Sequence, residues 1–124
     1  MSKAAFTLAA FSVYLVLLGL GLIFAPAPLL SIFGMPPPLE VWIRVVGVTV
    51  LNIGVYYWYA AKSEAVPFFR ASVYVRAGVF AWFLGFVIAD LSPPILILFG
   101  AADLAGAIWT FVALRATPPP AIPR

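Results

Sequence analysis

Four long apolar stretches, separated by short polar or proline-rich segments, make up most of this chain. They cover residues 4–24, 39–61, 68–89 and 94–114. Each is close to the length of about 20 residues with which an α-helix crosses the hydrocarbon core of a bilayer. None shows the strict alternation that indicates a half-buried strand. The pattern predicts an all-α fold, a four-helix transmembrane bundle that forms a single integral membrane domain over residues 1–124.

The segments around these stretches have their own character. Residues 25–38 contain Pro26 and Pro28, which stop a helix, and the stiff run 36–38. Between the prolines the segment is too apolar for a free loop, so we expect a short interfacial element there. A lid over a ligand site is the alternative interpretation. The proline-rich tail 115–124 is typical of a polyproline conformation.

The first apolar stretch resembles a secretory signal peptide in two respects. Lys3 precedes it, and the small residues 25–27 follow it. The stretch is longer than the 7–15 residues or so of a signal core, and Pro28 would lie directly after the cut. We therefore expect a retained membrane helix.

Composition supports the membrane assignment and excludes several kinds of chemistry. Hydrophobic residues make up 65% of the 124 residues and charged residues 9%, whereas soluble domains carry about 25% charged residues. The chain has no cysteine and no histidine. Disulfides, thiol redox chemistry, His/Cys zinc sites and Ser-His or Cys-His triads are thereby excluded, and we expect no metal site and no cofactor.

The cationic residues indicate an orientation. The net charge is +3, but the loops 25–38 and 90–94 contain neither lysine nor arginine. By the positive-inside rule both termini should be cytoplasmic. The charge is better explained by topology and by anionic lipids than by nucleic acid. The cations that share the predicted cytoplasmic side are Lys3, Lys62, Arg70, Arg115 and Arg124.

Asp103 lies near the middle of the last apolar stretch. An ionised carboxylate at that depth costs about 2.5–3.5 kcal/mol if nothing compensates it. At helical spacing Asp103 shares a face with Gly100, Gly106, Ala107 and Thr110, small or polar residues that let another helix approach closely. This face is therefore predicted to lie against a neighbouring helix.

Two arginines lie at a comparable predicted depth. Arg76 is roughly 12 Å along its helix from Phe68, and Arg44 roughly one turn nearer the opposite surface. Because intramembrane charges are usually paired, we predict a buried cluster of Asp103 with Arg76, Arg44 or both. Structural cross-linking of the helices and a ligand-binding site are both open interpretations of it. The residues predicted around this core are Glu40, Asn52 and Tyr14.

The second stretch carries two further patterns. Gly47 and Gly54 are predicted points of close helix packing. The stretch ends in the aromatic run 56–59, which is typical of an interfacial belt.

Two motifs resemble a known family. Arg44-Val45-Val46-Gly47, followed by Gly54, is similar to a motif of the DoxX-like group of small bacterial membrane proteins. The stretch Gly100–Thr110 is similar to the closing helix of related four-span proteins. The resemblance implies a four-helix protein of the bacterial inner (plasma) membrane, often an accessory or partner subunit.

Two classes of function remain open. The first is a membrane protein that binds a lipid or hydrophobic small molecule, or an accessory subunit of a larger membrane complex. The alternative is a small homo-oligomeric transporter or proton-coupled channel, with Asp103 as the proton carrier. We do not expect an enzyme, because no pair of nucleophile and base is recognisable.

Overall fold

The computed structural model describes residues 1–36 and 41–116. Every regular element in these two ranges is an α-helix, which confirms that the fold is all-α. The predicted apolar stretches correspond closely to the four long helices. The helices are α1 (Lys3–Phe24), α2 (Pro26–Ile32), α3 (Trp42–Lys62), α4 (Val66–Ile88) and α5 (Leu96–Ala116).

Local sequence explains where α1 begins and ends. The Ser2 side chain accepts a hydrogen bond from the Ala5 N–H at 3.0 Å and caps the first turn. Pro26 cannot continue α1, but it is well suited to the first turn of the following helix, α2. The short segment expected after the first span is therefore helical, and its position at the membrane interface stays a prediction.

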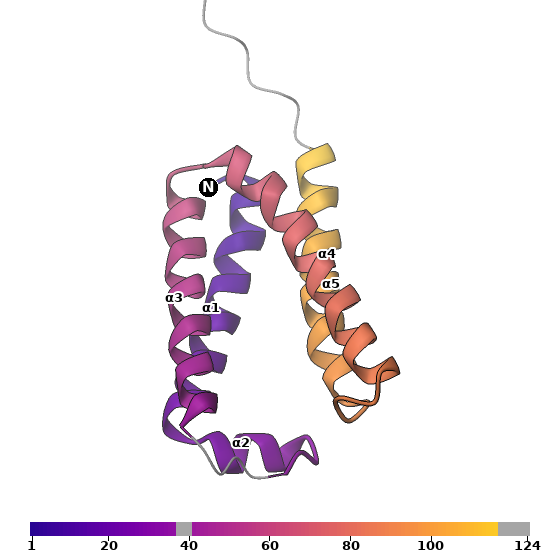
Figure 1. Cartoon of the computed structure of the whole chain (residues 1–124). Coiled ribbons are helices and arrows are strands. Elements are labelled where there is room, and N and C mark those ends of the chain that lie inside the picture. Colours follow the sequence, from indigo (N-terminus) through magenta and orange to yellow (C-terminus); the bar gives the residue numbers. More distant parts are fainter. Residues whose placement is uncertain (37–40, 117–124) are drawn as a thin grey trace, which may run out of the picture.

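The long helices form two antiparallel pairs, α1 with α3 and α4 with α5 (Figure 1). Backbone contact holds the first pair. A Cβ atom on Gly19 would lie 2.8 Å from the Gly47 carbonyl oxygen, and one on Gly54 would lie 3.1 Å from Leu15 Cβ. The predicted packing role of Gly47 and Gly54 is confirmed.

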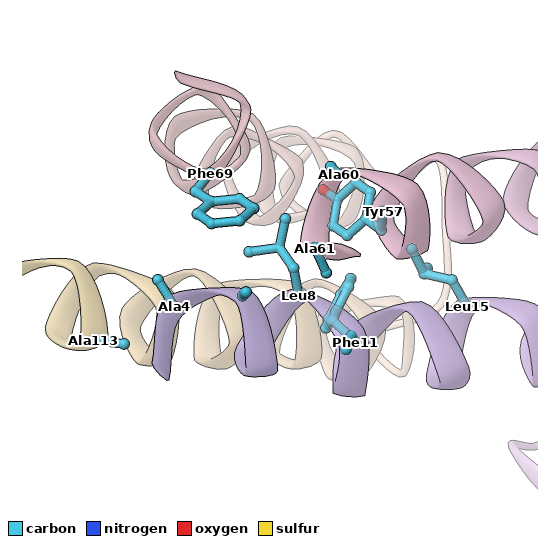
Figure 2. Packing of buried hydrophobic residues seen from close by; sticks show 11 residues of the cluster. Ala4, Leu8, Phe11, Leu15, Tyr57, Ala60, Ala61, Phe69 and Ala113 are labelled. Atoms are coloured by element: carbon cyan, nitrogen blue, oxygen red, sulfur yellow. The ribbon is translucent and has the colours of Figure 1, made fainter. Parts of the chain in front are cut away.

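The buried core lies toward one end of the molecule, where the two pairs converge. Figure 2 shows Leu8 and Phe11 directed from α1 toward Tyr57 of α3 and Phe69 of α4. Away from this end the two pairs separate, and α2 lies across the opposite end of the first pair (Figure 1). The contact between the pairs is therefore concentrated at α1 and α5.

Within the described ranges three helices, α1, α4 and α5, are long and apolar enough to cross a membrane. The four spans and the transmembrane bundle stay predictions. Although α3 is 21 residues long, Arg44, Asn52 and its aromatic end lower its hydropathy. Large apolar side chains cover the outside of the molecule, as in Trp82, which is 70% exposed. Such a surface is expected where lipid, not water, surrounds the helices.

Candidate functional site

Arg76 occupies the middle of α4, and its side chain is only 2% exposed. Its Nε donates to the Ser72 carbonyl oxygen at 3.2 Å. Its Nη2 donates to Ser72 Oγ at 3.1 Å and to Thr110 Oγ1 at 2.7 Å. A buried cation is tolerated only where such partners replace its hydration. The Thr110 bond joins α4 to α5.

The hydroxyl groups beyond Arg76 form a directed chain. Thr7 donates its only hydroxyl hydrogen to the Ala4 carbonyl oxygen at 2.7 Å. In the 2.7 Å contact between the two threonines, Thr110 must therefore be the donor and Thr7 the acceptor. The chain runs from Arg76 through Thr110 and Thr7 to the backbone of Ala4. It links α4, α5 and α1 through buried atoms.

Two aromatic rings enclose the guanidinium. Its Cζ atom lies 4.8 Å from the ring centroid of Phe11 on α1 and 5.6 Å from that of Tyr57 on α3. A cation over an aromatic face gains about 2 kcal/mol when the pair is desolvated. All four long helices therefore meet at Arg76. We call this set the Arg76 junction: Thr7, Phe11, Tyr57, Ser72, Arg76 and Thr110.

One nitrogen of the guanidinium has no acceptor among the described residues. Nη1 is buried and makes no hydrogen bond. It lies against Gly106 of α5, where an added Cβ atom would be 3.0 Å from Nη1 and 2.9 Å from the Phe11 ring. A glycine at this position gives the guanidinium and the ring the room they occupy.

Asp103 is half-buried on α5 and is not bonded directly to Arg76. Within the described ranges no carboxylate oxygen lies within 4.0 Å of an Arg76 nitrogen. Helical side chains lean toward the N-terminus of their helix. Because α5 is antiparallel to α4, this lean carries Arg76 toward Thr110 and away from Asp103. The expected ion pair is replaced by an electrostatic interaction over a longer distance.

The other predicted cluster residues have different fates. Tyr14 is half-buried, packs on Phe11 with ring centroids 5.3 Å apart, and interacts electrostatically with Asp103. Arg44 is exposed and donates to the Ile23 carbonyl oxygen near the end of α1. Asn52 is also exposed. Because α3 packs on α1 through its glycine face, these two residues are not brought to Asp103. Glu40 lies outside the described residues.

A pocket of about 310 Å³ that is largely open to the outside lies between α1 and α5, beside the Arg76 junction. We call it the α1–α5 cavity. Its walls are apolar, apart from the hydroxyl of Tyr14 and the indole N–H of Trp109. At the rim Trp109 is 46% exposed and makes an edge-to-face contact with Phe6. The residues that line it are Ala10, Phe11, Tyr14, Ala102, Ala105, Gly106 and Trp109.

Sequence reasoning missed part of this site. The aromatic run 56–59 is predicted as one interfacial belt, but Tyr57 is 6% exposed and Tyr56 65%. Helical periodicity contains the signal, because Tyr57 follows Gly54 at i+3 on the face that packs against α1. Ser72 and Arg76 are likewise four residues apart on one helix face.

Comparisons with known proteins do not add to this site. No family model, curated protein or solved structure matches the chain. The resemblance to the DoxX-like group therefore stays a prediction. The function has to be inferred from the geometry of the α1–α5 cavity and the Arg76 junction.

Proposed function

We propose that this protein binds a lipid or hydrophobic small molecule inside the membrane, in the α1–α5 cavity. The observation that carries the proposal is the cavity itself, with its apolar and aromatic walls and about 310 Å³ of volume. Ligand sites in proteins are concave and mostly apolar with a few polar groups, and they have volumes of about 300–1,000 Å³. This cavity lies at the lower end of that range. The proposed ligand is accordingly small, or only part of it enters.

The position of the cavity favours access from the bilayer. Its α1 residues begin at Ala10, about 10 Å along the helix from Lys3, and so lie within the candidate span. Trp109, one of the lining residues, is partly exposed and belongs to the candidate span α5. A molecule dissolved in the hydrocarbon region reaches the rim without crossing water.

Filling the cavity tests the proposal. Ala102→Phe places a ring among the lining residues, whereas Ala81→Phe adds the same ring to an exposed position of α4. Both proteins and the wild type are extracted gently from their own membrane and weighed by native mass spectrometry. We expect a defined added mass on the wild type and on Ala81→Phe, and its loss from Ala102→Phe.

The same measurement separates the binding function from an accessory one. A bare protein in all three samples contradicts the proposal. A second polypeptide in the complex supports the role of an accessory subunit, which the resemblance to the DoxX-like group implies. An identical added mass on all three proteins shows binding elsewhere on the surface and also contradicts the proposed site.

The proposed membrane is the bacterial inner membrane, with both termini cytoplasmic. This orientation requires α3 to span as well, because three spans would place the termini on opposite sides. The chain has no cysteine, so single cysteines report cleanly. We expect Ser92→Cys to react with an impermeant maleimide in intact spheroplasts and Ser63→Cys to react only after permeabilisation. Reaction of both in intact spheroplasts contradicts the four-span orientation.

Asp103 supports a second candidate, a proton-coupled transporter. It lies within a candidate span, and its carboxylate makes no hydrogen bond or ion pair within the described part of the chain. In proteoliposomes with an imposed proton gradient, the wild-type protein would then carry protons across the membrane when the ligand found by mass spectrometry is present. Asp103→Asn would abolish that flux while leaving the added mass in place. Equal flux in both contradicts a carrier role for Asp103.

A further inference from the structure

The unpaired nitrogen of Arg76 identifies the class of ligand that the α1–α5 cavity takes. Of the five N–H hydrogens of an arginine, Nε contributes one and Nη2 two, and all three of these are engaged. The two hydrogens on Nη1 have no acceptor among the described residues, although Arg76 is only 2% exposed. A buried donor without an acceptor is costly.

Nη1 lies directly behind the wall of the cavity. Gly106 lines the cavity, and Nη1 is 3.0 Å from the position a Gly106 Cβ would take. The Phe11 ring, which also lines the cavity, is the other group packed at this point. The Phe11 ring and the backbone of Gly106 therefore separate Nη1 from the cavity, and Nη1 itself is not part of the cavity wall. A ligand reaches Nη1 only if the Phe11 ring moves aside.

The geometry excludes a paired contact with a carboxylate or phosphate. Such anions bind arginine by two parallel hydrogen bonds from two nitrogens, but Nε and Nη2 already donate to Ser72 and Thr110. Only the two N–H groups of Nη1 are free to donate to a ligand. An anion would also add to the negative charge of Asp103, which already interacts with Arg76.

We propose that the ligand is an uncharged hydrophobic compound whose carbonyl oxygen accepts a hydrogen bond from Nη1 of Arg76. This inference rests on the proposed function, because it names the class of ligand for the same cavity. The aromatic walls formed by Phe11, Tyr14 and Trp109 favour a flat ligand, which can stack on them. A flat ketone stacks on these aromatic rings and accepts a hydrogen bond from one of the two N–H groups of Nη1.

Benzophenone provides a direct probe, since it is a neutral diaryl ketone that cross-links to nearby C–H groups under ultraviolet light. The full chain in lipid nanodiscs is irradiated with benzophenone, and the cross-linked peptides are mapped. Competition is then measured with three molecules of similar size: butyrophenone, which has the carbonyl, butylbenzene, which lacks it, and 4-propylbenzoate, which is an anion. Concentrations are expressed relative to lipid, because the three partition differently.

The inference predicts cross-links within residues 10–14 and 102–109, and competition by butyrophenone at about tenfold lower concentration than butylbenzene. The anion should compete least. Arg76→Met should remove the preference for the ketone. Because that variant disturbs the Arg76 junction, Thr110→Val serves as the control: it weakens the junction but keeps Nη1, and the preference should persist.

The outcomes separate the two levels of the proposal. If butyrophenone and butylbenzene compete equally, and if neither competes in Ala102→Phe, the carbonyl inference is overturned and the proposed function is retained. Water then accepts the hydrogen bonds of Nη1. Stronger competition by 4-propylbenzoate also overturns it, in favour of an anion. Cross-links that spread over the outer surface and are unchanged in Ala102→Phe overturn the proposed function itself.

Discussion

Replacing Thr110 by valine removes a single hydroxyl at the point where three helices are joined. Valine has nearly the same shape, so packing is retained while two hydrogen bonds are lost. These are the 2.7 Å bond from Arg76 Nη2 and the 2.7 Å bond to Thr7. Both are fully buried, and the first involves a charge.

The expected loss of stability follows from these two contacts. Hydrogen bonds between membrane helices average about 0.6 kcal/mol each, with a maximum near 1.7. A bond to a charged group lies at the upper end, about 1.5–3 kcal/mol in soluble proteins. Together they predict that Thr110→Val lowers the free energy of unfolding by about 1–3 kcal/mol. The loss is larger than for a surface threonine, because Arg76 stays buried and loses an acceptor.

Reversible unfolding in mixed micelles, titrated with SDS, measures this loss. Thr49→Val is the matched control, since Thr49 is exposed and, among the described residues, its hydroxyl donates only to the Val45 carbonyl oxygen in its own helix. Thr7→Val and the double variant complete a mutant cycle, which isolates the energy of the contact between the two threonines. A loss for Thr110→Val no larger than for Thr49→Val, or a coupling energy near zero, would refute the reasoning.

Three other perturbations test different parts of the structure. Gly19→Ala should separate α1 from α3 and destabilise the protein strongly, because its Cβ would lie 2.7 Å from the Leu51 backbone nitrogen. SDS titration measures the loss of unfolding free energy, with Gly78→Ala as the control, since a Cβ at Gly78 meets nothing within 4 Å. A loss in Gly19→Ala no greater than in Gly78→Ala contradicts the prediction. Gly106→Ala should destabilise the Arg76 junction and, unlike Gly78→Ala, should also reduce benzophenone cross-linking in the cavity. Hydrogen bonds from the Ser2 side chain and then its backbone N–H lower the pKa of Glu64 below its ordinary value. The hydrogen bonds from Ser2 to Glu64 are therefore fully formed above the ordinary glutamate pKa and are lost as the pH falls through the lowered pKa of Glu64. The NMR chemical shift of the Ser2 amide proton should follow this titration, and Glu64→Gln should abolish the pH dependence.

The helices and much of their packing can be predicted from the sequence, because each depends on local features. Apolar length determines the span of each long helix, and the missing side chains of Gly47 and Gly54 allow α3 to approach α1 closely. The small face of α5 is also where prediction and structure agree, since Gly100, Gly106 and Thr110 are all buried.

The partners of Arg76 could not be predicted from depth alone. Depth along the membrane places Arg76 and Asp103 at the same level, but the direction of the arginine side chain decides which of the α5 residues it reaches. That direction follows from the lean of helical side chains and from the antiparallel order of α4 and α5, and it selects Thr110. Arg44 was misplaced for a related reason: only the tertiary packing shows that α3 lies on α1 and not on α5.

The cavity was beyond the reach of sequence reasoning. Its walls come from α1 and α5, and although its α5 residues belong to the stretch Gly100–Thr110, nothing in that stretch indicates a pocket. In sequence, Ala102 and Ala105 are typical of any membrane helix. Their role depends on the angle between the pairs, which no local pattern encodes.

The most direct test of the cavity uses Trp109 as a sensor at its rim. The chain has four tryptophans, so Trp42, Trp58 and Trp82 are replaced by phenylalanine to leave Trp109 alone. A second protein keeps only Trp82, which faces outward from α4. Both are titrated in nanodiscs with 4-bromobenzophenone, whose bromine quenches nearby indole fluorescence. Saturable quenching of Trp109 that disappears in Ala102→Phe, beside unsaturable quenching of Trp82, is the predicted result. Quenching of Trp109 that rises without saturation and matches Trp82 would contradict a ligand site between α1 and α5.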